Sequence, residues 1–171
     1  PMLANADYVM FTGSTATGRL IGELAGKNLI GACLELGGKN PMLVLEDANV
    51  DEAVEAAIFG AFGNSGQICM HIERLYVHDS IYDEFRDKFV AATQAMNVSA
   101  AYDFLPDMGS LVSIDQKDRI ASHVEDAKKK GATVLTGGEA RPDLGPAFFE
   151  PTILEGVTKD MLAGETETFG P

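Results

Sequence analysis

Basic residues are scarce in this sequence. Its 171 residues include 13 Lys and Arg against 26 Asp and Glu, which gives a formal net charge of −13. Nucleic-acid binding requires clustered cationic side chains that neutralise phosphates, so this balance argues against a nucleic-acid partner. The one basic run, residues 128–130, precedes Gly131. We expect these lysines to lie at the carbonyl end of a helix that the glycine caps.

Cysteine and histidine are also scarce. Two cysteines, Cys33 and Cys69, do not make a disulfide framework and fit a reducing, cytoplasmic setting, where a lone cysteine is a candidate nucleophile. The three histidines (His71, His78 and His123) are scattered, and the sequence contains neither an HxxxH nor a CxxC pair. We therefore expect no metal site.

Long apolar runs, signal-peptide patterns, repeats and low-complexity segments are absent as well. A membrane span needs about 20 apolar residues, so we expect no membrane partner. The content of 46% hydrophobic and 23% charged residues is typical of a globular protein. The length suffices for one good-sized core or for pieces of two domains. Because the sequence starts at Pro1 and stops at Pro171 without a tail, we expect an excised segment of a longer protein.

Local patterns predict alternating strands and helices. Residues 7–12 are rich in β-formers and predict a buried strand, after which Ser14 or Thr15 begins a helix that reaches about residue 26. Further strands are expected at residues 29–36, 41–45, 74–77, 133–135 and about 151–154. Strand, helix and strand in this order indicate a parallel α/β arrangement.

Three further helices carry start signals. Asn49 and Glu52 are spaced as a capping box for a helix over residues 49–61, and Ser113 and Gln116 for one over residues 113–130. Between them, Ser80 is expected to cap a helix with a buried face of Ile81, Phe85, Phe89, Ala92 and Met96.

Residues 13–18 form a glycine-bounded turn from the first strand into the first helix. Such a turn offers backbone N–H groups to an anion. Arg19 stands where a P-loop needs Lys followed by Ser or Thr, so that interpretation fails. A phosphate site and a plain strand–helix turn both remain open.

Two side chains are candidates for covalent chemistry. Cys69 follows a helix and a glycine turn, where backbone N–H groups favour a thiolate; the alternative is a small buried apolar residue. Glu35 lies in an apolar run, where partial removal from water suits a general base; the alternative is the wet face of a strand. Cys33 is expected in the core, and His71 to be a polar or packing residue rather than a partner of the thiol.

Four blocks together resemble the signatures of the aldehyde dehydrogenase superfamily. They are Phe-Thr-Gly-Ser-Thr-x-x-Gly (residues 11–18), Leu-Glu-Leu-Gly-Gly-Lys-Asn-Pro (34–41), Asn-x-Gly-Gln-x-Cys (64–69) and Glu-x-Phe-Gly-Pro (167–171). They occur in the family's order, and the resemblance covers essentially the whole chain.

The resemblance implies an α/β, aldehyde dehydrogenase-like fold. Residues 1–35 would be the end of a Rossmann-like cofactor domain. Residues 36–171 would be an α/β catalytic domain, incomplete at its C-terminal end. The full-length protein is expected to be a homo-oligomer that acts on a small aldehyde.

The resemblance also assigns the chemistry. Cys69 would attack the aldehyde to form a thiohemiacetal, hydride transfer to NAD or NADP would give a thioester, and Glu35 would activate the water that hydrolyses it. The Cys69 N–H would contribute to an oxyanion hole. The implied cofactor-binding residues are Gly13, Ser14, Leu36, Gly37, Glu167 and Phe169. Ser14 would contact the pyrophosphate, the Leu36 backbone the carboxamide, and the last two residues the nicotinamide ribose and ring.

Within the family, residues 7–18 and 137–145 look most like succinate-semialdehyde dehydrogenases, so the best expectation is oxidation of succinate semialdehyde to succinate. Arg74 is expected to be structural rather than a substrate ligand. Other aldehydes, a relative that passes the thioester to coenzyme A, a non-catalytic member and a generic nucleotide-binding module are the alternatives. Glu35 argues against the acylating relative, which tends to lack that base.

Two departures from the family pattern stand out. His71 occupies a position where most relatives have a small residue, which affects packing near the thiol. The family's oxyanion-hole asparagine is expected upstream of Pro1, so we expect the 171 residues alone to be inactive.

Overall fold

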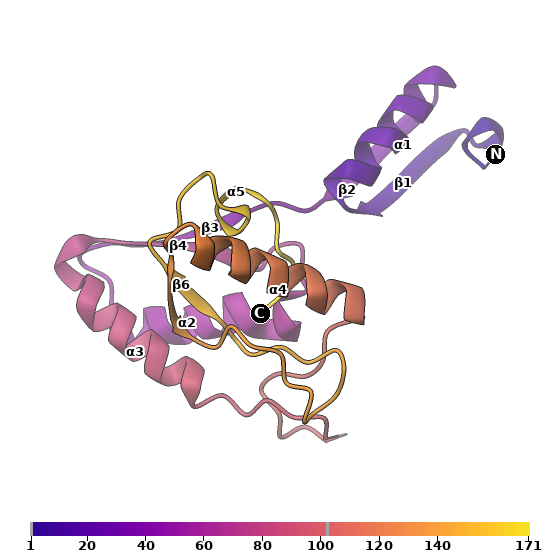
Figure 1. Cartoon of the computed structure of the whole chain (residues 1–171). Helices are drawn as coiled ribbons and strands as arrows, with labels where there is room; N and C mark the ends of the chain where they lie inside the picture. The colour runs from indigo at the N-terminus through magenta and orange to yellow at the C-terminus, as the bar shows by residue number, and fades with distance from the viewer. Residues whose placement is uncertain (1, 102) are drawn as a thin grey trace. The chain divides into compact units, whose positions relative to one another are not determined.

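The computed structural model describes residues 2–101 and 103–171. They form two compact units, one that ends at Gly38 and one that comprises Lys39–Pro171. Figure 1 labels the elements of both units. Within the described residues, no helix has the length and hydrophobicity that a bilayer span requires.

The first unit is a parallel strand–helix–strand motif. β1 (Tyr8–Gly13) pairs in parallel with β2 (Gly31–Leu36), and α1 (Thr15–Lys27) connects them. Ser14 caps α1, because its Oγ accepts a hydrogen bond from the Thr17 N–H at 3.3 Å. The predicted arrangement and cap are confirmed.

The prediction that residues 7–12 are buried is wrong for this unit. Met10 is 79% exposed and Tyr8 57% exposed, and Leu24 on α1 is exposed too. Two strands and one helix have too little area to cover both faces of a sheet. Cys33, expected in the core, is half-buried.

In the described residues of the second unit, four strands form two sheets. β3 (Asn40–Val44) pairs in parallel with β4 (Ile72–Val77), whereas β5 (Thr133–Thr136) pairs antiparallel with β6 (Ile153–Glu155). The sequence predicted all four strands, with ends that differ by one or two residues, as is usual for strand boundaries.

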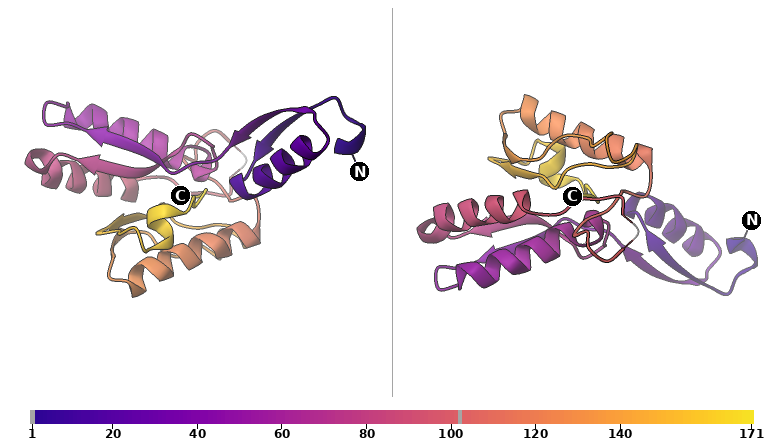
Figure 2. Two further views of the ribbon diagram at one scale, coloured as in Figure 1. Left: turned by 90° about the horizontal axis from the view of Figure 1, so that it is seen from above. Right: turned by 90° about the horizontal axis from the view of Figure 1, so that it is seen from below.

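The helices of this unit lie in two groups. The helices are α2 (Val50–Phe62), α3 (Tyr82–Gln94), α4 (Ile114–Lys129) and the short α5 (Leu162–Glu165). The described 3-10 turns are η2 (Gly63–Gly66) and η3 (Asp79–Ile81) in this unit and η1 (Leu3–Asn5) in the first unit. Figure 2 shows α2 and α3 together with β3 and β4, and α4 beside the yellow C-terminal segment. Lys128 and Lys129 lie in the last turn of α4, and Gly131 follows with a φ of 98°, which confirms the predicted helix end.

The N-terminal caps were predicted in part. Asn49 Oδ1 accepts hydrogen bonds from the N–H groups of Asp51 and Glu52, which confirms the start of α2. The prediction for Ser80 is wrong, because this serine lies inside η3. His78 caps that turn instead, with Nδ1 accepting from the Ser80 N–H at 3.3 Å.

The second capping box also departs from its prediction. Ser113 caps α4 as expected, since its Oγ accepts a hydrogen bond from the Gln116 N–H at 3.1 Å. The Gln116 side chain does not return to the cap but binds the backbone of residues 168–169. The sequence pattern gives only the spacing of a capping box. It does not reveal that the backbone of residues 168–169 binds the Gln116 side chain in place of the cap.

Two apolar clusters form the core of the second unit. The larger contains the buried residues Val44, Val54, Ala57, Ala61, Phe62, Phe85, Phe89 and Met108, and the smaller Leu111, Ile120, Val124 and Phe149. Phe89 on α3 joins the helices of the larger cluster, with ring centroids 5.6 Å from Phe85 and 6.0 Å from Phe62.

We expect Phe89→Ala to lower the free energy of unfolding by about 3–5 kcal/mol, because the ring is 4% exposed and its removal leaves a cavity. Urea denaturation of the longest native polypeptide that contains this chain measures the change. Phe104→Ala is the control: the Phe104 side chain is fully exposed in the chain, so its loss should cost no more than about 0.5 kcal/mol. Equal losses for the two variants would contradict the assigned core.

Candidate active site around Cys69

Cys69 follows a turn with a rare backbone conformation. After α2, Asn64, Ser65 and Gly66 have φ angles of 52°, 56° and 67°. Non-glycine residues adopt such angles only where surrounding contacts hold them. One such contact comes from Ser65, whose Oγ donates a hydrogen bond to the Gly109 carbonyl at 3.0 Å and whose side chain is buried.

Asn40 fixes the backbone around the cysteine. Its Nδ2 donates hydrogen bonds to the carbonyls of Cys69 and His71, both at 2.9 Å. Cys69 itself is exposed and forms no disulfide. Residues 67–71, which we call the thiol loop, therefore combine a fixed backbone with an accessible thiol. This excludes the alternative of Cys69 as a small buried residue within the chain.

His71 points away from the thiol chemistry. It is 3% exposed, and its Nδ1 lies 2.7 Å from the Ile68 carbonyl, so this nitrogen carries the proton. Its Nε2 lies 3.0 Å from Glu73 Oε1, at ion-pair distance but without the alignment of a hydrogen bond. His71 is thus a packing and polar residue, in agreement with the sequence interpretation.

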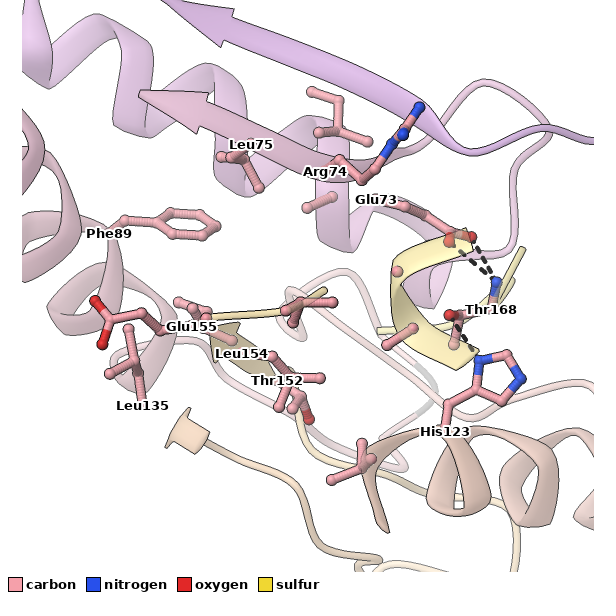
Figure 3. A pocket seen from close by; sticks show the side chains of 18 of the residues that line it. Glu73, Arg74, Leu75, Phe89, His123, Leu135, Thr152, Leu154, Glu155 and Thr168 are labelled. Atoms are coloured by element: carbon pink, nitrogen blue, oxygen red, sulfur yellow. Dashed lines mark hydrogen bonds between the residues drawn. The ribbon is translucent and has the colours of Figure 1, made fainter. Parts of the chain in front are cut away.

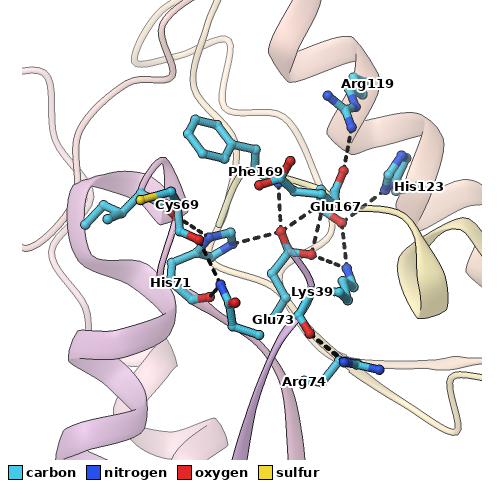
Figure 4. Close-up of polar contacts among 12 residues, drawn as sticks. Lys39, Cys69, His71, Glu73, Arg74, Arg119, His123, Glu167 and Phe169 are labelled. Atoms are coloured by element: carbon cyan, nitrogen blue, oxygen red, sulfur yellow. Dashed lines mark hydrogen bonds and ion pairs between the residues drawn. The ribbon is translucent and has the colours of Figure 1, made fainter. Parts of the chain in front are cut away.

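Glu73 lies at the centre of the polar contacts in Figure 4, and the sequence analysis missed it. Its carboxylate is 4% exposed and forms an ion pair with Lys39 Nζ. It also accepts hydrogen bonds from the N–H groups of Thr168 (2.9 and 3.0 Å) and Phe169 (3.0 Å). An acidic residue inside the apolar strand β4 was the signal that could have revealed it.

The ionised form of the Glu73 carboxyl is strongly favoured. Burial raises the pKa of this carboxyl, but the contacts with His71, Lys39 and the Phe169 N–H outweigh burial and lower the pKa to about 2. Burial also lowers the pKa of Lys39, although its pairing with Glu73 opposes that effect. The pair is therefore an ionised contact inside the unit.

The C-terminal segment, residues 167–169, is held from a second side. Gln116 Nε2 donates hydrogen bonds to the carbonyls of Thr168 (2.9 Å) and Phe169 (2.8 Å), and Arg119 donates to the Glu167 carbonyl at 2.5 Å. The Phe169 ring meets the His71 ring edge to face, with centroids 6.1 Å apart. The structure thus places Phe169, an expected cofactor-binding residue, against the thiol loop, with Glu167 two residues before it.

The remaining expected site residues lie in the first unit. Gly13 and Leu36 are paired at the carboxyl ends of the parallel strands β1 and β2, with Ser14 directly following. Glu35 is exposed within this unit, so the partial burial expected for it is not found there. The carboxyl edge of parallel strands is the usual position of ligand sites in α/β folds.

The N-terminus of α1 suits an anionic group. In this 13-residue helix the first N–H groups have no acceptor within the helix, and the exposed Ser14 stands at its start. A pyrophosphate is stabilised by such N–H groups and by the helix dipole. Gly18 has another role: a Cβ there would lie 2.5 Å from the Leu36 side chain, so glycine permits α1 to pack on β2.

A cavity of about 410 Å³ lies near Glu73 in the second unit (Figure 3). Leu75, Phe89 and Leu154 line its apolar part, and His123 and Thr168 lie at one end. Cys69 is not among its lining residues. We therefore do not assign this cavity to the aldehyde.

The sequence profile described as "Aldehyde dehydrogenase family" matches residues 3–171. The chain belongs to the aldehyde dehydrogenase family. It is 54% identical over 170 residues to a Mycolicibacterium smegmatis protein named "Putative succinate-semialdehyde dehydrogenase [NADP(+)]", covering 99% of this chain and 33% of that protein. Identity is 52% over 167 residues to a Mycobacterium tuberculosis (strain ATCC 25618 / H37Rv) protein with the same name and the number 2, covering 98% and 32%.

Solved aldehyde dehydrogenases share the fold. The NAD+ complex of the Bacillus cereus aldehyde dehydrogenase superposes with a TM-score of 0.93 at 39% identity, covering 98% of this chain and 34% of that one. The Burkholderia pseudomallei succinate-semialdehyde dehydrogenase gives 0.92 at 40% identity, with 98% and 35% covered. The expected α/β, aldehyde dehydrogenase-like fold is confirmed, and the chain spans about a third of the length of the curated relatives it matches.

For this aldehyde dehydrogenase segment, we expect Gly66→Ala to disrupt the turn before the thiol loop. A Cβ on Gly66 would lie 2.2 Å from the Gly170 carbonyl oxygen, and the φ of 67° is unfavourable for alanine. Unfolding in urea should show a loss of about 2 kcal/mol or more. Gly109→Ala, which adds its Cβ where no atom lies within 4 Å, should change stability little; a similar loss there would refute the assigned contact.

The pKa of Glu73 predicts a stability change in acid. Because folding lowers this pKa from 4.5 to about 2, the ionised carboxylate stabilises the fold above pH 4.5, and this contribution is lost as the pH falls toward 2. The difference corresponds to about 3 kcal/mol. The stability gap between the native protein and Glu73→Gln, measured by urea unfolding, should therefore shrink between pH 4.5 and 2. A gap that is constant with pH would contradict the lowered pKa.

Proposed function

We propose that the longer protein containing this chain oxidises succinate semialdehyde to succinate with NAD or NADP. The observation that carries this proposal is the accessible thiol of Cys69 on a backbone fixed by Asn40. The names of the mycobacterial relatives, which specify succinate semialdehyde and NADP(+), support the substrate and the cofactor.

Cys69 is the nucleophile in this proposal. Its thiolate forms a C–S bond to the aldehyde carbon, and the resulting thiohemiacetal loses a hydride to become a thioester. When bound, the nicotinamide cofactor supplies the hydride acceptor that no side chain provides. The Cys69 N–H donates to the developing oxyanion, for which the fixed thiol loop provides a constant position.

Glu35 is the proposed general base. It accepts a proton from a water molecule whose oxygen attacks the thioester carbon, and cleavage of the C–S bond releases the acid and the thiolate. Its exposure within the first unit leaves the carboxylate accessible to such a water. A glutamate at this position favours hydrolysis over transfer of the acyl group to coenzyme A.

Two domains with different roles belong to this proposal. Residues 1–35 are proposed as the end of the cofactor domain and residues 36–171 as the catalytic domain. Gly13 and Ser14 would hold the pyrophosphate at the start of α1, and the backbone of Leu36 and Gly37 the carboxamide.

The C-terminal segment completes the cofactor site in this proposal. Glu167 would bind the nicotinamide ribose, and Phe169 would contact the ring. The two free cysteines fit a reducing compartment, so we propose a cytoplasmic location. We also propose that the full-length protein is a homo-oligomer.

Two substitutions test the reaction in the longest native polypeptide. We expect Cys69→Ser to abolish formation of reduced cofactor from succinate semialdehyde. Glu35→Gln should lower turnover by about 10²–10⁴-fold, because a general base contributes this much, and should leave a thioester on Cys69 that mass spectrometry detects.

Cys33→Ser, which changes the other cysteine in the same way, is the control and should retain turnover. Undiminished turnover of Cys69→Ser would refute the proposed nucleophile. An absence of turnover in the native protein with either cofactor, restored by coenzyme A, would favour the acylating reaction instead.

A further inference from the structure

We propose that Glu73 is a positioning residue that fixes the thiol loop and residues 167–169 relative to each other. This inference rests on the proposed function for its catalytic consequence, but not for its structural part. The carboxylate accepts hydrogen bonds from Lys39 Nζ and from the N–H groups of Thr168 and Phe169, and His71 Nε2 lies 3.0 Å from its Oε1, so its contacts come from three parts of the chain.

The contact between Glu73 and His71 links the carboxylate to the loop that carries the nucleophile. His71 Nε2 lies 3.0 Å from Glu73 Oε1, and the opposite ring nitrogen binds the carbonyl of Ile68, the residue before Cys69. Because the imidazole is 3% exposed and rigid, it transmits the position of the carboxylate to the thiol loop.

The contacts between Glu73 and residues 168–169 link the carboxylate to the segment proposed to hold the cofactor. Both consecutive N–H groups of residues 168 and 169 donate to Glu73, while Gln116 binds both of the carbonyls. Phe169 has a φ of 57°, a left-handed conformation that a residue other than glycine rarely adopts. The conformation of this segment is therefore imposed by side chains from β4 and α4, since it belongs to no helix or strand.

The charge network extends to the hydroxyl of Thr168. Lys39 Nζ donates to Thr168 Oγ1 at 3.2 Å, and His123 Nδ1 lies 3.0 Å from the same oxygen. Lys39 is bound in turn to β4 through its carbonyl, which accepts from Arg74 Nε at 3.0 Å. This gives Arg74 a structural place, as the sequence analysis expected.

A fixed relation between these two segments has a direct use in the proposed reaction. The thiohemiacetal on Cys69 must present its C–H bond to the nicotinamide that Glu167 and Phe169 would hold, and an error of about 1 Å in such a geometry can lower a rate about 100-fold. Glu73 touches neither reactant, so it acts only through the residues that it positions.

Glu73→Gln tests the inference because it retains the shape and removes half of the acceptors. An amide offers one oxygen and an NH2 group, which cannot accept from Lys39 and from two N–H groups at once. A hydrogen bond to a charged group contributes about tenfold or more to an equilibrium constant. We therefore expect hydrogen exchange of the Thr168 and Phe169 amides to accelerate about tenfold or more, with exchange in α2 and α3 unchanged.

The thiol and the kinetics provide the second and third readouts. In Glu73→Gln, the rate at which iodoacetamide alkylates Cys69 should change at least about threefold, and kcat for succinate semialdehyde should fall about tenfold or more with a smaller change in KM. The matched control is Glu125→Gln, which removes an exposed ion pair with Lys128 on α4 and should leave all three readouts as in the native protein.

Glu73→Asp is the alternative test variant if Glu73→Gln does not fold. It keeps the charge and the pairing with Lys39, but the side chain is shorter by one methylene, so exchange at Thr168 and Phe169 should still accelerate. Native exchange and alkylation rates in a folded Glu73 variant would overturn the inference, as would acceleration spread evenly over the whole unit. Accelerated local exchange in a protein whose native form oxidises no aldehyde would uphold the positioning role and refute the proposed function.

Discussion

A carboxylate removed from water is stable in a protein only where donors replace the water. Glu73 meets this condition with Lys39 and two backbone N–H groups, and these contacts, together with the nearby His71 ring, keep it ionised despite its 4% exposure. The contacting residues lie just before β3, in the thiol loop and in the C-terminal segment. One buried charge therefore determines how three irregular parts of the chain meet, and the arrangement around Cys69 depends on it.

Backbone strain is concentrated in the same region. Asn64, Ser65, Gly66 and Phe169 all have positive φ angles, and a Cβ on Gly66 would collide with the Gly170 carbonyl. The turn before the thiol loop and the segment at the C-terminus thus fit against each other through their backbones. Hydrogen bonds from Ser65, Asn40 and Gln116 offset the strain. Such over-determined loops are typical of sites that hold reacting groups in a fixed position.

Much of the fold could be predicted from the sequence, and less of the site. The strands and helices follow from apolar periodicity and from caps such as Ser14, Asn49 and Ser113, because these signals act between near neighbours. The predicted capping box at Ser113 failed in part because the Gln116 side chain binds a distant backbone carbonyl. The predicted cap at Ser80 failed because His78 caps the local turn instead. The burial expected for residues 7–12 failed because one helix covers too little of a two-stranded sheet.

The sequence by itself determined the family, since its four blocks keep the order and spacing that mark an aldehyde dehydrogenase, and the comparisons confirm this. It also singled out Cys69 and Glu35 through their glycine-rich and apolar surroundings. Only the tertiary structure revealed Glu73 and the path from Cys69 through His71 to Phe169, whose members are up to 100 positions apart. Long-range contacts of this kind leave no local periodicity, because a buried ion pair is defined by the positions of its partners in space and not by their spacing along the chain.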